Sequence, residues 1–106
     1  MRILLDECVP RRFRRELPEH EVRTAPAMGW ASFENGDLLA AASGKFDVLV
    51  TTDQRLSWQQ NVSNFSIAVI VLVARRNKLE MLCPLVPELR AVLADIRPGQ
   101  VRRVGV

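Results

Sequence analysis

The amino-acid sequence predicts one α/β domain with a mostly parallel sheet of four to five strands, in the order 2-1-3-4 with a fifth segment beyond strand 4. One indication is that strand-length apolar segments alternate with segments of helical spacing, as in βαβ units. Another is that residues 48–50 and 67–73 are continuously apolar, which is typical of strands buried on both faces. The length of 106 residues corresponds to a single domain, residues 1–106.

The first half of the chain contains two predicted strands and two predicted helices. Residues 2–5 form an apolar strand, and a helix follows from Pro10 to about residue 17, since proline suits a first helical turn. Residues 21–25 form the second strand, and a helix spans residues 36–43 with Asn35 as its N-cap. The buried face of the first helix is predicted from apolar residues at every fourth position: Val9, Phe13 and Leu17.

The second half of the chain continues the alternation. Residues 47–52 form a third strand, residues 54–61 a helix-like turn, and residues 67–73 a fourth strand. Residues 78–96 keep helical spacing, and residues 101–106 form a short final strand. The long last helix contains two residues that are expected to break or restart it: Pro84 and Pro87.

Three acidic residues lie where the topology brings distant segments together. Asp6 follows strand 1 and Asp53 follows strand 3, and the carboxyl ends of parallel strands share one edge of the sheet. Asp37 lies in the first turn of the helix after strand 2, which is at the same edge. We therefore expect Asp6, Asp37 and Asp53 to meet in one crevice, where open α/β sheets bind ligands.

A cluster of carboxylates needs a cation or protons, because the negative charges repel one another. Oxygen ligands favour Mg²⁺ or Mn²⁺ over zinc, and such a metal activates water and stabilises charge on a phosphoryl group. Each acid also has an ordinary explanation, since Asp6 and Asp53 could cap the following helices and Asp37 could complement a helix dipole. Glu7 could be a further metal ligand or could pair with an arginine.

Basic and amide side chains near these acids are candidates for contact with an RNA backbone. Arg11, Arg12 and Arg55 would steer phosphates. Trp30 and Phe33 are expected to cover the sheet edge as part of the core, although they could stack on bases. Amides that could contact a scissile phosphate, or simply lie exposed at a helix end, come from the segment after the third strand: Gln54, Gln60 and Asn61.

Composition limits the remaining possibilities. No apolar run approaches the roughly 18–20 residues of a membrane span, and no secretory signal is recognisable, so a cytoplasmic location is expected. The two cysteines, Cys8 and Cys83, form no CxxC pair and are expected to be reduced thiols rather than zinc ligands. The formal charge is +3 and the basic residues are 13 Arg and 2 Lys, which suits a nucleic-acid partner but also follows from a GC-rich genome.

Several stretches of the chain resemble a known family, the short PIN-like proteins related to VapC toxins of bacterial type II toxin–antitoxin pairs. The resemblance covers nearly the whole chain and is carried by RILLDE (2–7), MGWA (28–31), NGDLL (35–39), FDVLVTTD (46–53), QQN (59–61), NKLE (77–80) and LVP (85–87).

The resemblance implies a PIN-like three-layer sandwich and a Mg²⁺-dependent endoribonuclease, with Asp6, Asp37 and Asp53 as the matching acids. It also implies a small cognate antitoxin that covers the active site. The chain departs from larger PIN nucleases, which carry a fourth acid after the third, because only amides such as Gln54 are present there. This departure is compatible with a one-metal site, or with a fold that binds RNA without cutting it.

Three hypotheses of function remain open at this point. The first is a Mg²⁺- or Mn²⁺-dependent ribonuclease toxin. The second is a non-catalytic module that binds metal or RNA, and the third is a receiver-like signalling domain, which also carries acids after strands 1 and 3. The third is disfavoured because neither of the only lysines, Lys45 and Lys78, follows the last strands in the position that would neutralise a phosphoryl group. An exposed apolar edge near strand 4 or 5 could support a homodimer.

Overall fold

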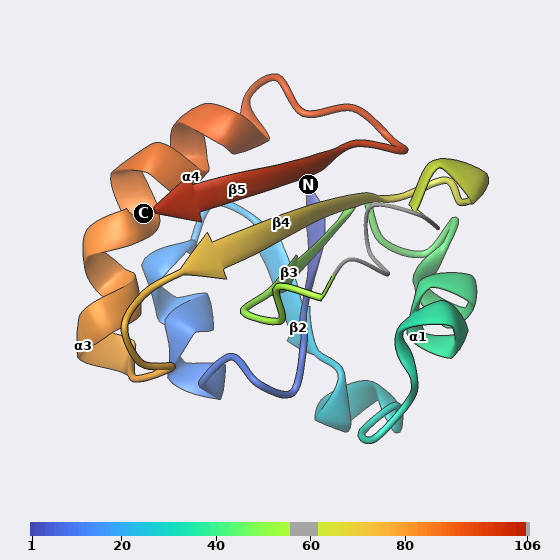
Figure 1. Ribbon diagram of the computed structural model, residues 1–106, viewed down its shortest axis with the longest axis horizontal. Helices are drawn as coiled ribbons and strands as arrows, with labels where there is room; N and C mark the ends of the chain where they lie inside the picture. The colour runs from blue at the N-terminus through green and yellow to red at the C-terminus, as the bar shows by residue number, and fades with distance from the viewer. Residues whose placement is uncertain (56–61, 106) are drawn as a thin grey trace.

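The computed structural model describes residues 1–55 and 62–105. Within them, five strands form one all-parallel sheet in the order β2-β1-β3-β4-β5, with the fifth strand beyond β4 as the sequence predicts (Figure 1). The strands are β1 (Arg2–Leu5), β2 (Glu21–Thr24), β3 (Val48–Thr51), β4 (Ala68–Val73) and β5 (Val101–Gly105).

The helices of the described residues connect consecutive strands. They are α1 (Asn35–Ala42), α3 (Leu79–Leu82) and α4 (Val86–Leu93), with short 3-10 helices over Arg11–Glu16, Pro26–Met28, Val62–Asn64 and Cys83–Leu85. None of these helices is long and apolar enough to cross a membrane.

The helical segment predicted over residues 78–96 is divided at its two prolines, as the sequence predicts. Pro84 lies in the 3-10 helix between α3 and α4, and Pro87 is the second residue of α4. Proline cannot donate a backbone hydrogen bond in a helix interior, so the chain restarts its helix at Val86. The regular helix also ends earlier than predicted, at Leu93.

The first predicted helix forms as a 3-10 helix over Arg11–Glu16. Pro10 is not in its first turn but precedes it in extended backbone, with ψ of 131°. The predicted apolar face is confirmed, because Val9, Phe13 and Leu17 are all buried.

Two hydrophobic clusters pack on the two faces of the sheet, so the domain has three layers (Figure 1). One cluster joins Ile3, Leu5 and Val50 of the strands to α4 and to the 3-10 helix over Arg11–Glu16. The other joins Leu4 and Leu49 to α1. Side chains of a strand point alternately to opposite faces, so these two sets follow directly from the sequence of each strand.

Helix α1 begins one residue earlier than predicted and takes Glu34 as its N-cap residue, with no capping hydrogen bond from the Glu34 side chain. Asn35 is therefore the first residue of the helix and not its cap. Its side chain reaches another strand end instead, as described below. The helix is followed by Gly44, whose φ of +81° lies in the left-handed region.

Two glycines, Gly36 within α1 and Gly44 just after it, allow the backbone conformation at these two positions to be tested by substitution. Gly44→Ala is expected to lower the free energy of unfolding by about 1 kcal/mol, because its positive φ strains any side chain. Gly36→Ala is expected to raise it by about 0.5–1 kcal/mol, because Gly36 lies in the helix and nothing is within 4 Å of an added Cβ. Urea unfolding of both variants checks the prediction, and equal changes of the same sign would contradict it.

Candidate metal-binding and RNA-binding pocket

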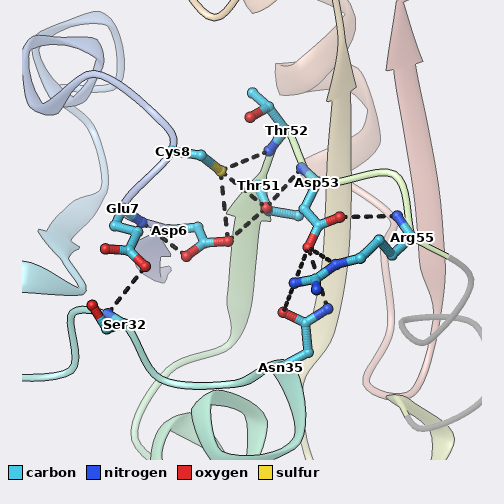
Figure 2. Close-up of polar contacts among 9 residues, drawn as sticks. All are labelled: Asp6, Glu7, Cys8, Ser32, Asn35, Thr51, Thr52, Asp53 and Arg55. Atoms are coloured by element: carbon cyan, nitrogen blue, oxygen red, sulfur yellow. Dashed lines mark hydrogen bonds and ion pairs between the residues drawn. The ribbon is translucent and has the colours of Figure 1, made fainter.

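A pocket of about 350 Å³ lies at the carboxyl edge of the sheet. Its polar walls come from the ends of β1 and β3 and from the start of α1 (Figure 2). This is the edge at which parallel α/β sheets bind ligands. The pocket is lined by Asp6, Glu7, Cys8, Phe33, Asn35, Asp53 and Arg55.

Asp6 enters this pocket through the register of the sheet. Leu5 is paired with Val50, so the next residues of the two strands, Asp6 and Thr51, lie opposite each other. The Asp6 backbone N–H donates to the Val50 carbonyl at 2.9 Å, which continues the strand ladder by one residue. The backbone pairing alone therefore sets the position of Asp6, independently of its side-chain contacts.

The Thr51 hydroxyl connects the two acidic strand ends. It donates to Asp6 Oδ2 at 2.7 Å and accepts the Asp53 backbone N–H at 3.0 Å. Thr51 is fully buried, and it is the one buried polar side chain of the described residues. Burial of a hydroxyl is tolerated only when it is hydrogen-bonded, so this contact holds Asp6 and Asp53 in a defined relation.

Cys8 lies behind the same carboxylate. Its Sγ is 3.6 Å from Asp6 Oδ2 and 3.4 Å from Thr51 Oγ1, and it accepts the Thr52 backbone N–H at 3.4 Å (Figure 2). The Glu7 backbone N–H donates to the other Asp6 oxygen, Oδ1, at 2.8 Å. Both oxygens of Asp6 are therefore oriented by neighbours.

Asp53 is held by a cation and an amide. Arg55 Nε and Nη2 each lie 2.7 Å from Asp53 Oδ2, and the Arg55 backbone N–H donates to Oδ1 at 3.0 Å. Asn35 Nδ2 donates to Asp53 Oδ2 at 3.3 Å, and Asn35 Oδ1 accepts from Arg55 Nη2 at 3.2 Å. Figure 2 shows the contacts that join these three side chains.

The charge state of Asp53 follows from these contacts. Partial burial raises the pKa of Asp53, but the hydrogen bonds from Arg55 and Asn35 and the Arg55 charge outweigh it, so the pKa lies below its ordinary value. The Asp53 carboxylate in turn raises the pKa of Arg55. Asp53 is consequently a carboxylate at neutral pH.

This contact predicts a pH-dependent contribution to stability. Because folding lowers the Asp53 pKa, the contribution is complete above the unfolded value of about 3.9 and is lost as pH falls through the folded value. Arg55→Ala is expected to lower the free energy of unfolding slightly at pH 7, since the Arg55 side chain is 64% exposed, and to have a smaller effect below about pH 3.9.

Urea unfolding of wild type and Arg55→Ala across this pH range measures the effect. Arg12→Ala is the matched control, because Arg12 forms no ion pair with a carboxylate in residues 1–55 and 62–105. An Arg55→Ala deficit that grows as the pH falls would contradict the assignment.

Glu7 binds the loop before α1 and also lines a second cavity. Its Oε1 accepts the Ser32 backbone N–H at 3.0 Å, which attaches the loop before α1 to the end of β1. Glu7 also lines a second cavity of about 450 Å³ beside the first, together with Arg11, Thr24 and several apolar residues. The two cavities therefore share one carboxylate.

The other residues predicted for the site lie in different places. Asp37 is exposed in the first turn of α1 and does not line the pocket. Residues two apart in a helix point in different directions, so Asn35 reaches Asp53 and Asp37 does not share its direction. Among the described residues, no group of three His, Cys, Asp or Glu side chains lies close enough to hold a metal ion.

The residues predicted to contact RNA lie in several different parts of the structure. Arg55 lines the pocket, Arg11 lines the neighbouring cavity, and Arg12 is exposed on the 3-10 helix. Gln54 is exposed, and its Oε1 accepts a hydrogen bond from Arg103 of β5 at 2.5 Å. Two further predicted residues lie outside the described residues: Gln60 and Asn61.

Sequence reasoning missed four contributors to the pocket. Thr51 could have been found by aligning the apolar runs of β1 and β3, which sets it opposite Asp6. Cys8, Asn35 and Ser32 carry no local signal, because their partners are distant in the sequence or belong to the backbone.

The fold and the pocket together define an α/β protein with an all-parallel sheet and a polar pocket at its carboxyl edge. Comparisons with protein-family models, with curated proteins and with solved structures find no match. The chemistry of the pocket therefore carries the functional argument.

Proposed function

We propose that this protein is a PIN-like endoribonuclease that hydrolyses RNA phosphodiesters in the pocket at the sheet edge, with Mg²⁺ or Mn²⁺ as its cofactor. The observation that carries the proposal is that Asp6 and Asp53, from adjacent strands, line one pocket together with Glu7. Asp6 and Asp53 lie 47 positions apart in the sequence, and a purely structural role does not require their carboxylates to meet.

The donor set suits a small hard cation. Mg²⁺ is usually bound by one or two protein carboxylates, with waters and substrate phosphates as the remaining ligands. Asp6 and Asp53 would hold the ion, and Glu7 would act only through the ion's waters, because no three acidic side chains of the described residues lie close enough to hold a metal together. A bound ion of this kind activates water and stabilises negative charge on a phosphoryl group.

The chain's own side chains orient the carboxylates and the substrate. Thr51 fixes Asp6 by its hydrogen bond to Oδ2, and Asn35 fixes Asp53. Arg55 pairs with Asp53 in the structure. Its guanidinium would be suited to bind a phosphate oxygen once a cation takes up the charge on Asp53. Arg11 lies at the adjacent cavity, where it would hold the next part of the backbone.

The direct test is cleavage of single-stranded RNA by the purified protein. We expect hydrolysis with Mg²⁺ or Mn²⁺, none after chelation, and a metal-dependent rise in melting temperature that reports binding independently of activity. The absence of both hydrolysis and a melting-temperature shift would overturn the proposal.

The resemblance to toxins of type II toxin–antitoxin pairs extends the proposal to a biological role. We propose that the ribonuclease activity arrests growth and that a small antitoxin relieves the arrest by covering the pocket. Growth arrest on induced expression of the wild type, and its absence on expression of an inactive pocket variant, would support this role. Unimpaired growth with active, cleaving protein would show that the enzyme is not a toxin.

A second candidate is a non-catalytic RNA-binding module. The ion pair between Arg55 and Asp53 favours it, because the guanidinium already satisfies one of the two carboxylates. RNA binding that is insensitive to chelation, without turnover on any RNA, would favour this candidate over the ribonuclease.

A further inference from the structure

One aromatic side chain lies exposed at the edge of the polar pocket. Phe33 is 40% exposed and lines the pocket with Asp6, Asp53 and Arg55. Among the described residues, the other aromatic side chains are buried or half-buried, so Phe33 does not serve the core as the sequence suggested. The exposed ring therefore shares one cavity with the carboxylates and the guanidinium.

The ring of Phe33 packs against a second aromatic ring. It stacks on Trp30 with ring centroids 6.4 Å apart and an interplanar angle of 27°. Trp30 meets the buried Phe46 edge to face at 6.1 Å, and Lys45 Nζ lies 5.5 Å from the Trp30 ring centroid. Phe33 is therefore supported through Trp30 by the core beside α1 and is not a loose loop residue.

The loop that carries Phe33 is also attached to the acidic end of β1. Ser32 has a φ of +67°, a left-handed conformation that is unfavourable for a residue with a side chain. Its backbone N–H donates to Glu7 Oε1, a charge-assisted bond that helps to keep this conformation. Glu7 thereby fixes the position of Phe33 relative to Asp6.

We infer that Phe33 is a stacking platform for one base of single-stranded RNA, whose adjacent phosphate lies at Arg55 and the carboxylates. The inference rests on the proposed ribonuclease function and specifies how that site takes its substrate. A nucleotide presents an aromatic base and a phosphate, and the pocket presents an exposed ring and a guanidinium in the same cavity. Bases in a duplex are stacked on one another, so the platform selects unpaired RNA.

The test is a double-mutant cycle, in which wild type and Phe33→Ala are each measured with intact RNA and with RNA that lacks one base. Binding of a short fluorescently labelled single-stranded RNA is measured by anisotropy in Ca²⁺, and the RNA is checked for intactness afterwards. Phe33→Ala is expected to weaken binding roughly 5- to 100-fold, as stacking contacts do. One abasic position is expected to weaken binding to wild type by a similar factor and to have little effect on Phe33→Ala.

Two control variants make the result specific to the ring. Phe33→Trp keeps an aromatic face and is expected to bind within a few-fold of wild type. Met81→Ala removes a side chain of matched exposure, 41%, that does not line the pocket, and it is expected to leave binding unchanged. Melting temperatures of all variants confirm that they are folded.

The outcomes separate this inference from the function on which it rests. RNA cleavage by wild type together with unchanged affinity of Phe33→Ala, or an equal abasic penalty in both proteins, overturns the platform and leaves the ribonuclease standing. Phe33 would then be free to contact a protein segment. Phe33-dependent binding without hydrolysis supports the platform and overturns the ribonuclease. Failure of wild type to bind RNA overturns both.

Discussion

Asp6→Asn and Asp53→Asn are each expected to reduce Mg²⁺-dependent RNA cleavage at least about a hundredfold. The substitution keeps the shape of the side chain and removes the charge that would attract the cation. Asp6 retains an oxygen that can accept from Thr51, so the local structure is expected to persist. Single-turnover cleavage and the Mg²⁺-induced rise in melting temperature measure the two effects, and both are expected to be lost together.

Two other acids provide controls for this result. Asp47 precedes β3 at the opposite edge of the sheet and contacts Arg2, so Asp47→Asn is expected to leave cleavage unchanged. Asp37→Asn tests the third predicted acid, and its exposed position outside the pocket predicts a smaller loss than Asp6→Asn. Cleavage that survives in both Asp6→Asn and Asp53→Asn would refute the assignment of this pocket as the active site.

Thr51→Val is expected to lower cleavage about 10- to 100-fold, although Thr51 is not expected to contact the substrate. Valine has nearly the same shape but cannot donate to Asp6 Oδ2 or accept from the Asp53 N–H. The unsatisfied N–H and the loss of the hydroxyl are expected to lower the free energy of unfolding by about 1–2 kcal/mol. Cleavage kinetics and urea unfolding measure these two losses separately.

Thr51→Ser is the matched variant for this prediction. Serine keeps the hydroxyl and loses one methyl group, which lowers stability by about 0.8 kcal/mol but leaves the hydrogen bonds to Asp6 and Asp53 possible. We therefore expect Thr51→Ser to cleave RNA within a few-fold of wild type. Comparable losses of activity in the Ser and Val variants would mean that packing, and not the hydroxyl, positions Asp6.

The sheet was predictable because its signals are local and strong. The runs 48–50 and 67–73 are continuously apolar, and they lie in or directly before β3 and β4, where all of them except Val73 are buried. The helices were predicted less well, because their form depends on single residues. Pro84 and Pro87 divide the last helix as expected, but the regular helix ends at Leu93. The segment after Pro10 forms a 3-10 helix, although its apolar face is the predicted one.

The sequence predicted the residues of the candidate site only where the order of the strands determines which residues meet. Asp6 and Asp53 line one pocket because β1 and β3 are neighbours and parallel. Asn35 was assigned as a helix cap because a local rule applies to it, whereas its side chain contacts Asp53 and Arg55. The exposure of Phe33 depends on how its loop packs, which the sequence pattern does not specify.

The all-parallel arrangement of the sheet also has a consequence for how the protein folds. Within residues 1–55 and 62–105, all four neighbouring strand pairs are parallel and none forms a hairpin, and the pair β1–β3 joins residues 45 positions apart. Loop-closure entropy opposes such contacts until several form together, so folding is expected on the slower timescales of non-local topologies, milliseconds or longer. The pocket, which requires β1 beside β3, can appear only after this closure has occurred.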